Sequence, residues 1–230
     1  MMHKFSGSCP VCGGEEFIQK DVLWPELINA WQLSVAEVAY VNRQQGFHCT
    51  RCFNNLRSMA VAAAILREYQ FQGTLNQFCQ THTNLSVYEI NCAGHLTSSL
   101  KMLSGHKLIE YPYFDMMDLK IESECTDLIV HSDTLEHIPN PERALSECRR
   151  ILRADGKCIF TIPIIVDRMS RSRAGLARSY HGQAQIDADD HLVHTEFGVD
   201  MWKVVIGAGF ASCEIFSFEY PAALVLIAKK

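Results

Sequence analysis

The sequence predicts an α/β fold, in which a mostly parallel sheet carries helices on both faces, preceded by a small metal-binding segment. From residue 85 onward, short apolar stretches alternate with stretches whose apolar residues recur at helical spacing. Before residue 57, two Cys-x-x-Cys pairs supply four thiols. We therefore divide the chain into an N-terminal segment, residues 1–56, and a main domain, residues 57–230.

The two cysteine pairs predict a structural zinc site, because four thiolates form the tetrahedral set that Zn²⁺ prefers. The expected ligands are Cys9, Cys12, Cys49 and Cys52. A redox dithiol and four unligated thiols are the alternatives, and the neighbouring His48 would be able to replace one thiolate. A closed four-thiolate site has no open position for catalysis, so its expected role is to fold a segment that is too small to hold its own core.

Two helices are expected around the second cysteine pair. Residues 25–46 read as a helix inserted between the pairs, with Ser34 as an N-cap and Glu37 three residues later as a capping box. Residues 54–70 have apolar residues at helical spacing and predict a helix that packs on the main domain. Arg57 lies in its first turn.

The main domain is expected to alternate strands and helices. The expected strands are residues 85–90, 107–111, 126–132, 157–163, 211–219 and 223–230. The expected helices are residues 93–103, 140–152 and 199–209. Asn140 is the expected cap of the second of these helices, and Pro141 suits its first position.

Polar residues follow several expected strands, and ligands of parallel sheets bind outside the carboxyl ends of the strands. The first strand ends in the small-residue turn Asn91-Cys-Ala-Gly94, which lets backbone N–H groups approach a ligand closely. Near the second strand end, the Glu110 carboxylate suits ribose hydroxyls, and Asp115 beside methionines suits an adenine edge. The stretch DLIVHSDTLEHIPNP, residues 127–141, ends the third strand in a polar cluster.

The segments YEINCAG, FDMMDL and DLIVHSDTLEHIPNPERALSECRRILRADGKCIFTIP resemble the class I S-adenosylmethionine (SAM)-dependent methyltransferases, in particular the methyltransferase type 11 branch. The resemblance covers residues 87–230. The cysteine pairs followed by CFNNLRSMA are similar to an N-terminal zinc-binding segment of some members. The resemblance implies a Rossmann-like fold, SAM as cofactor and a methyltransferase activity of class EC 2.1.1.

Together, the strand-end pattern and the resemblance give a set of expected cofactor-binding residues. These are Arg57, Glu89, Asn91, Ala93, Gly94, Glu110, Asp115, Met116, Ser132, Asp133 and His137. A capping role for Asp133, and a packing role for His137, are the alternatives for those two residues.

The sequence departs from the family pattern in two ways. Asn91, Ala93 and His95 stand where the glycines of the usual E-x-G-x-G-x-G motif are expected. Only about 20 residues separate Gly94 from Asp115, which predicts that one edge strand and its helix are missing. The short spacing leaves open whether Glu110 binds ribose or is a solvated residue, and the departures allow an inactive, regulatory or assembly module as the alternative function.

The segment of residues 164–198 is too long for a simple connection and is expected to form an acceptor-binding lid, with a solvated loop as the alternative. Its histidines are candidate general bases for an acceptor of high pKa. They are His181, His191 and His194. A metal site on these histidines is a further alternative. Four arginines in the segment suggest an acceptor with carboxylate or phosphate groups, and a small molecule or glycan methylated on O or N is expected.

The composition and charge of the sequence argue against other classes of protein. A net charge of -5 and a pI of about 6.0 argue against nucleic acid as a partner, including a zinc-ribbon nucleic-acid module. The sequence has no run of about 18 apolar residues and no signal-peptide pattern at its N-terminus, so a cytoplasmic protein without a membrane span is expected. The sequence does not indicate an oligomeric state.

Overall fold

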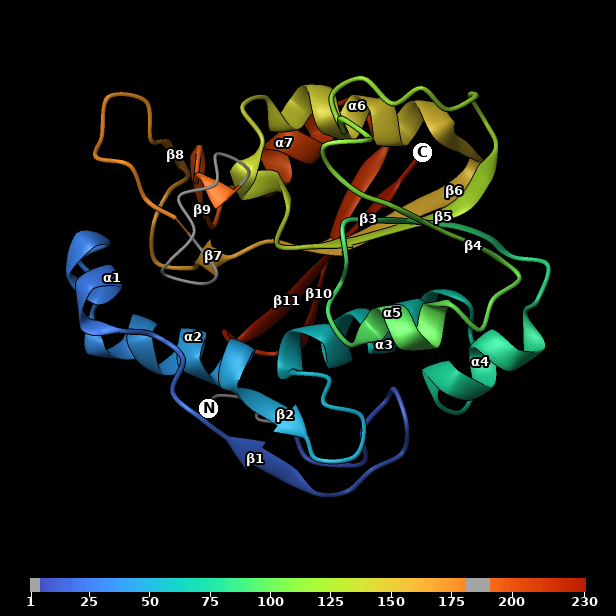
Figure 1. Cartoon of the computed structure of the whole chain (residues 1–230), viewed down its shortest axis with the longest axis horizontal. Coiled ribbons are helices and arrows are strands. Elements are labelled where there is room, and N and C mark those ends of the chain that lie inside the picture. Colours follow the sequence, from blue (N-terminus) through green and yellow to red (C-terminus); the bar gives the residue numbers. More distant parts are fainter. Residues whose placement is uncertain (1–4, 181–190) are drawn as a thin grey trace.

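A six-stranded sheet forms the centre of the computed structural model, which describes residues 5–180 and 191–230 (Figure 1). The strand order is β10-β11-β6-β5-β3-β4. Strands β4, β3, β5 and β6 are parallel, whereas β11 is antiparallel to both β6 and β10. The strands are β3 (Ser86–Ile90), β4 (Gly105–Ile109), β5 (Thr126–Ser132), β6 (Leu152–Thr161), β10 (Ser212–Glu219) and β11 (Ala223–Lys229).

Helices cover both faces of this sheet, as predicted (Figure 1). One face carries α3 (Leu56–Glu68), α4 (Leu75–Thr81) and α5 (Leu96–Leu100), and the other carries α6 (Pro141–Ile151) and α7 (Trp202–Gly207). Side chains alternate between the two faces along a strand. In β5, Leu128 and Val130 therefore pack in the first core and Ile129 packs in the second.

The N-terminal segment forms a two-stranded antiparallel sheet, β1 (Phe17–Gln19) and β2 (Phe47–Cys49), with two helices between its strands. The prediction of one helix over residues 25–46 is wrong, because the chain forms α1 (Pro25–Ala30) and α2 (Val35–Gly46). The backbone leaves the helical region between them, where Gln32 has φ 49°. The predicted capping box of Ser34 and Glu37 is confirmed and starts the second helix.

The edge of the sheet beyond β3 is formed by β4, which has one neighbouring strand among the residues that the structure describes. This agrees with the prediction that an edge strand is missing. The expected insertion, residues 164–198, contains the three short strands of a second sheet, ordered β7-β9-β8. They are β7 (Ile164–Ile165), β8 (Arg171–Ser172) and β9 (Thr195–Gly198).

None of the helices within residues 5–180 and 191–230 has the length and apolar composition that a membrane span requires.

Candidate active site

The four cysteines of the N-terminal pairs lie together. All four Sγ atoms lie within 4.8 Å of one another, with the Sγ atoms of Cys9 and Cys52 3.6 Å apart and those of Cys12 and Cys49 3.7 Å apart. His48 is not in this cluster, and its Nδ1 lies 3.0 Å from the carbonyl oxygen of Gly46. The sequence-predicted ligand set is therefore assembled in space.

The backbone around the thiols fits a metal ligand set. Gly13 has φ 74°, a conformation that favours glycine, and a Cβ on Gly14 would lie 2.8 Å from the Sγ of Cys49. The turns thus bring backbone close to sulfur, as a compact four-thiolate knuckle requires. Zn²⁺ is the ion that this donor set favours.

The turn after β3 is organised by Glu89, which is fully buried. Its Oε1 accepts hydrogen bonds from the Ala93 backbone N–H at 2.8 Å and from the Thr97 hydroxyl, and its Oε2 lies 2.7 Å from His106 Nε2. The Glu89 carboxylate therefore holds the turn in place from within the core. Gly94 is exposed with φ 68°, so the turn presents backbone at the strand end.

Of the other residues predicted to bind the cofactor, Asn91 directly follows β3, whereas Glu110, Asp115 and Met116 follow β4. Asn91 has φ 54°, and its Oδ1 accepts a hydrogen bond from the Tyr111 backbone N–H. Glu110 and Asp115 are exposed, and Asp115 Oδ1 accepts from the Met117 backbone N–H at 2.8 Å. Met116 is 4% exposed and packs in the core beside α6. The expected cofactor roles of these residues stay predictions.

A cavity of about 600 Å³ lies at the carboxyl ends of β5 and β6, between the main domain and the inserted helices. Its apolar wall comes from the residues just before α1, from one residue each of α1 and α2, and from the residues after β6. These residues are Val22, Leu23, Trp24, Leu27, Val41, Pro163, Ile164 and Ile165. Its polar lining is Gln44, Gln45, Arg57, Cys92, Ser132, Asp133, Glu136, His137 and His191. Five of the expected site residues, Arg57, Ser132, Asp133, His137 and His191, therefore line one cavity.

The polar floor is held by hydrogen bonds across three elements. Asp133 has φ 46°, forms an ion pair with Arg57 of α3 and accepts a hydrogen bond at 2.9 Å from the side chain of Gln45 of α2. The hydroxyls of Ser132 and Thr161 lie 2.8 Å apart and join the ends of β5 and β6. The N-terminal segment is therefore bonded to the sheet at the cavity.

Glu136 was not among the predicted site residues, yet it is the most unusual group of the cavity. Its side chain is buried, and neither carboxylate oxygen has a hydrogen-bond partner among the described residues. Burial raises the pKa of Glu136 to about 8, and burial lowers the pKa of Arg57 to about 10. A second carboxylate three residues after Asp133, directly beyond the strand, was the available signal in the sequence.

Two of the three candidate bases, His191 and His194, line different hollows. His191 lines the cavity, with its ring centroid 6.1 Å from that of His137, whose pKa is lowered by burial. His194 lines a different hollow, and its backbone N–H donates to the carbonyl oxygen of Glu136 at 2.7 Å. His181 lies outside the described residues.

The arginines of the 164–198 segment are engaged within the protein. Arg168 donates to Glu37 of α2, which lowers the pKa of that carboxyl to about 2. Arg171 and Arg173 both pair with the buried Glu196. The Arg168 bonds join this segment to α2, and the other two pairs join β8 and Arg173 to β9. These three arginines therefore do not support an anionic acceptor, which stays a prediction.

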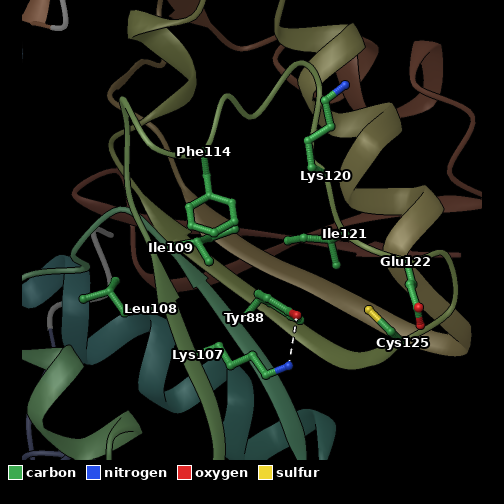
Figure 2. A pocket seen from close by; sticks show the side chains of 9 residues that line it. All are labelled: Tyr88, Lys107, Leu108, Ile109, Phe114, Lys120, Ile121, Glu122 and Cys125. Carbon is green, nitrogen blue, oxygen red and sulfur yellow. Dashed lines mark hydrogen bonds between the residues drawn. The ribbon is translucent and has the colours of Figure 1, made fainter.

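A second hollow lies at the free edge of the sheet, against β3 and β4 (Figure 2). Tyr88, Ile109 and Phe114 form its apolar lining, and Lys107 Nζ lies 3.2 Å from the hydroxyl of Tyr88. It contains none of the expected site residues, so the strand-end cavity is the better candidate for an active site.

Residues 72–160 match the family model described as a methyltransferase domain. This region begins just before α4 and ends within β6, so it includes the turn after β3 and the polar cluster after β5. No curated protein gave a significant sequence match.

Several solved structures are similar. The 1,6-didemethyltoxoflavin-N1-methyltransferase of Burkholderia thailandensis is 16% identical, with 68% of this chain and 76% of that chain covered and a TM-score of 0.39. A SAM-dependent methyltransferase from Thermotoga maritima is also 16% identical, with 74% and 99% covered and a TM-score of 0.41. The CMeT domain of citrinin polyketide synthase is 10% identical, with 88% and 58% covered and a TM-score of 0.47. TM-scores below 0.5 are too low to support an inference about chemistry.

Proposed function

We propose that this chain, which contains a methyltransferase domain at residues 72–160, is a SAM-dependent methyltransferase of class EC 2.1.1 that methylates an O or N atom of a small-molecule or glycan-type acceptor. The observation that carries the proposal is the strand-end cavity, because it joins the matched region to five of the expected site residues. Parallel α/β sheets bind their ligands at this position.

The residues around the β3 turn suit an adenosyl cofactor. The turn of residues 91–94 presents backbone next to the cavity, and Cys92 lines the cavity itself. Arg57, Ser132, Asp133 and His137 would hold the amino-acid portion, while Glu110 and Asp115 would hold the adenosine. The bound cofactor supplies an electrophilic methyl group on sulfur, so the protein mainly has to position the acceptor and exclude water.

The proposed zinc site has a structural role. Its four thiols bracket the chain that forms α1 and α2, and this chain supplies Val22, Leu23, Trp24, Leu27 and Val41 to the apolar wall. The metal would therefore fix the two ends of the segment that covers the acceptor. Among the histidines predicted as bases, His191 lines the cavity and is the one that we propose for contact with the acceptor.

A non-catalytic cofactor-binding module is the second candidate function. The departure that favours it is Asn91 and His95 in place of motif glycines. Such a module would bind SAM and its demethylated product, S-adenosylhomocysteine (SAH), without turning over any acceptor.

Calorimetry of zinc-loaded protein with SAM and SAH tests the cofactor site. We expect binding of both, and we expect Asp115→Ala to weaken it by about 1–3 kcal/mol if this carboxylate pairs with adenine. Asp118→Ala is the matched control, because Asp118 is an exposed aspartate paired with Lys120. The absence of heat with both SAM and SAH would refute the proposed function. An equal loss of affinity in Asp115→Ala and Asp118→Ala would refute the role of Asp115.

A further inference from the structure

We infer that the Glu136 carboxylate binds the amino group of the acceptor and takes its proton, so that the acceptor is an amine with an apolar body. This inference deepens the proposed function and rests on it. It assigns a catalytic residue and a substrate class to the cavity.

The first observation is that the carboxylate of Glu136 is buried without hydrogen bonds to the described residues. Glu136 is 1% exposed and lines the cavity. Neither of its side-chain oxygens has a hydrogen-bond partner among the described residues, and its Oε1 lies 3.5 Å from His137 Nε2. A buried carboxyl group without partners is costly and is rarely found away from a functional site. A ligand that donates hydrogen bonds would remove this cost.

The second observation is the charge of the cavity. One arginine, Arg57, lines it together with two carboxylates, Asp133 and Glu136. Arg57 is ion-paired with Asp133, which also accepts from Gln45. Arg57 also interacts electrostatically with Glu136, so one guanidinium faces two carboxylates, and a second cation is lacking among the described arginine and lysine residues that line the cavity. An ammonium group on the ligand would supply that cation, whereas an anionic ligand would add a second uncompensated charge.

The third observation is the position of Glu136 relative to the lid. The 3₁₀ turn η1 (Leu135–His137) is bonded to the acceptor-side segment by the His194 N–H and by His137 Nδ1, which lies 3.2 Å from the Leu192 carbonyl oxygen. The expected cofactor turn is on a different strand, after β3. Glu136 therefore lies between Asp133 and His137, which are expected to hold the cofactor, and is bonded through its backbone to the expected acceptor-side segment.

The walls of the cavity define the rest of the ligand. Leu23, Trp24 and Leu27 of the inserted segment, together with Ile164 and Ile165 of β7, form apolar surfaces in the same cavity. A ligand that fits both features has an apolar, or aromatic, body and a single amino group. Apolar walls with few convergent polar groups are typical of small-molecule sites.

The chemical step would balance with Glu136, the amine and bound SAM. The acceptor would bind as an ammonium ion and pass one proton to an Oε atom of Glu136. The freed nitrogen lone pair would then form a bond to the methyl carbon that SAM supplies, and the carbon–sulfur bond would break with its electron pair left on the sulfur of SAH. The proton leaves Glu136 for water after the product is released. The raised pKa of Glu136 suits a group that accepts a proton near neutral pH.

Other charged and titratable groups face the same space. They are Arg57 from α3, Asp133 and His137 from the segment after β5, and His191 from the acceptor side. The alternative reading is that Glu136 binds the amino group of the cofactor. Binding measurements on both ligands separate the two readings.

The test uses 2-phenylethylamine as the probe and 3-phenylpropanoate as its acid counterpart. Their affinities for zinc-loaded wild type and Glu136→Gln are measured by calorimetry with and without SAH, in two buffers of different ionisation enthalpy. Glu122→Gln is the matched control, because Glu122 is exposed and lies at the other hollow. Thermal unfolding of each variant verifies that the protein is folded.

We expect the amine to bind wild type and Glu122→Gln at least tenfold more tightly than Glu136→Gln, with net proton release near pH 7 that the Glu136→Gln variant lacks. The inference is overturned if the amine binds both proteins equally, if the acid binds wild type more tightly than the amine, or if neither probe binds. It is also overturned if Glu136→Gln weakens SAH tenfold and leaves amine affinity unchanged. Amine binding without any SAH binding would refute the proposed function and retain the amine site.

Discussion

Replacement of Glu136 by glutamine should change how the stability of this protein depends on pH. The substitution keeps the size of the side chain and removes its ability to ionise. Because the native carboxyl group is buried without partners among the described residues, wild type must either keep it protonated or carry a buried charge. The Glu136→Gln variant avoids both conditions, because its side chain does not ionise.

The size of the effect follows from the two pKa values of the carboxyl group. Burial raises the pKa of Glu136 from 4.5 to about 8 in the folded protein. The folded state then binds more protons than the unfolded state between these values, so wild type loses stability as pH rises through this window. At about 1.4 kcal/mol per pKa unit, the variant should gain about 3 to 4 kcal/mol over wild type between pH 5 and pH 8. Relaxation around the ionised group makes this figure an upper bound.

Urea unfolding of both proteins at several pH values measures this difference. Arg57, Asp133, His137 and His191 are present in both proteins, so their contributions largely cancel in the comparison. Glu122→Gln provides the control, because it removes an exposed carboxyl group that lies outside the cavity. If the free energy of unfolding of Glu136→Gln differs from that of wild type by an amount that stays constant within about 0.5 kcal/mol from pH 5 to pH 8, burial does not raise the pKa of Glu136.

Three further predictions concern other parts of the chain. Cys49→Ser should lose bound zinc, measured by elemental analysis, whereas Cys125→Ser should retain it; full metal content in both would exclude the four-thiolate site. Glu89→Gln should lower the free energy of unfolding by about 1–3 kcal/mol, because it weakens the bonds that shape the β3 turn, and an unchanged urea midpoint would contradict that role. Glu37→Gln should destabilise the protein at pH 7 but have little effect near pH 2. The Arg168 hydrogen bond lowers the pKa of Glu37 to about 2, so its contribution is present above pH 4.5 and is lost as pH falls toward 2; a difference that persists at pH 2 would contradict it.

The parts of the fold with strong local signals were predictable from the sequence. The strand β5 has the predicted bounds, residues 126–132, because its apolar run ends at a polar cluster. Asn140 caps α6 and Pro141 occupies its first turn, as predicted from their capping chemistry. The four cysteines lie together, as predicted from the two Cys-x-x-Cys pairs.

The cavity was harder to predict because its walls come from distant parts of the chain. Trp24 and Ile164 line the same space, yet 139 residues lie between them. The break between α1 and α2 was missed, since residues 25–46 have no proline or glycine between Pro25 and Gly46 to end a helix. Glu136 was missed because a glutamate after a strand is usually solvated, and its burial depends on the packing of η1 against β9.

The placement of α1 and α2 between the two cysteine pairs has a consequence for engineering. Residues 20–45 form a cassette whose ends adjoin β1 and β2 beside the thiol knuckle, and whose helix α2 is also bonded to Glu219 of β10 and to Asp133. Exchange of the cassette with Arg43 and Gln45 retained would alter the shape offered to an acceptor while the β3 turn stays as it is. A metal chelator should act on the same segment, so that zinc content and acceptor selectivity change together even though none of the four thiols lines the cavity.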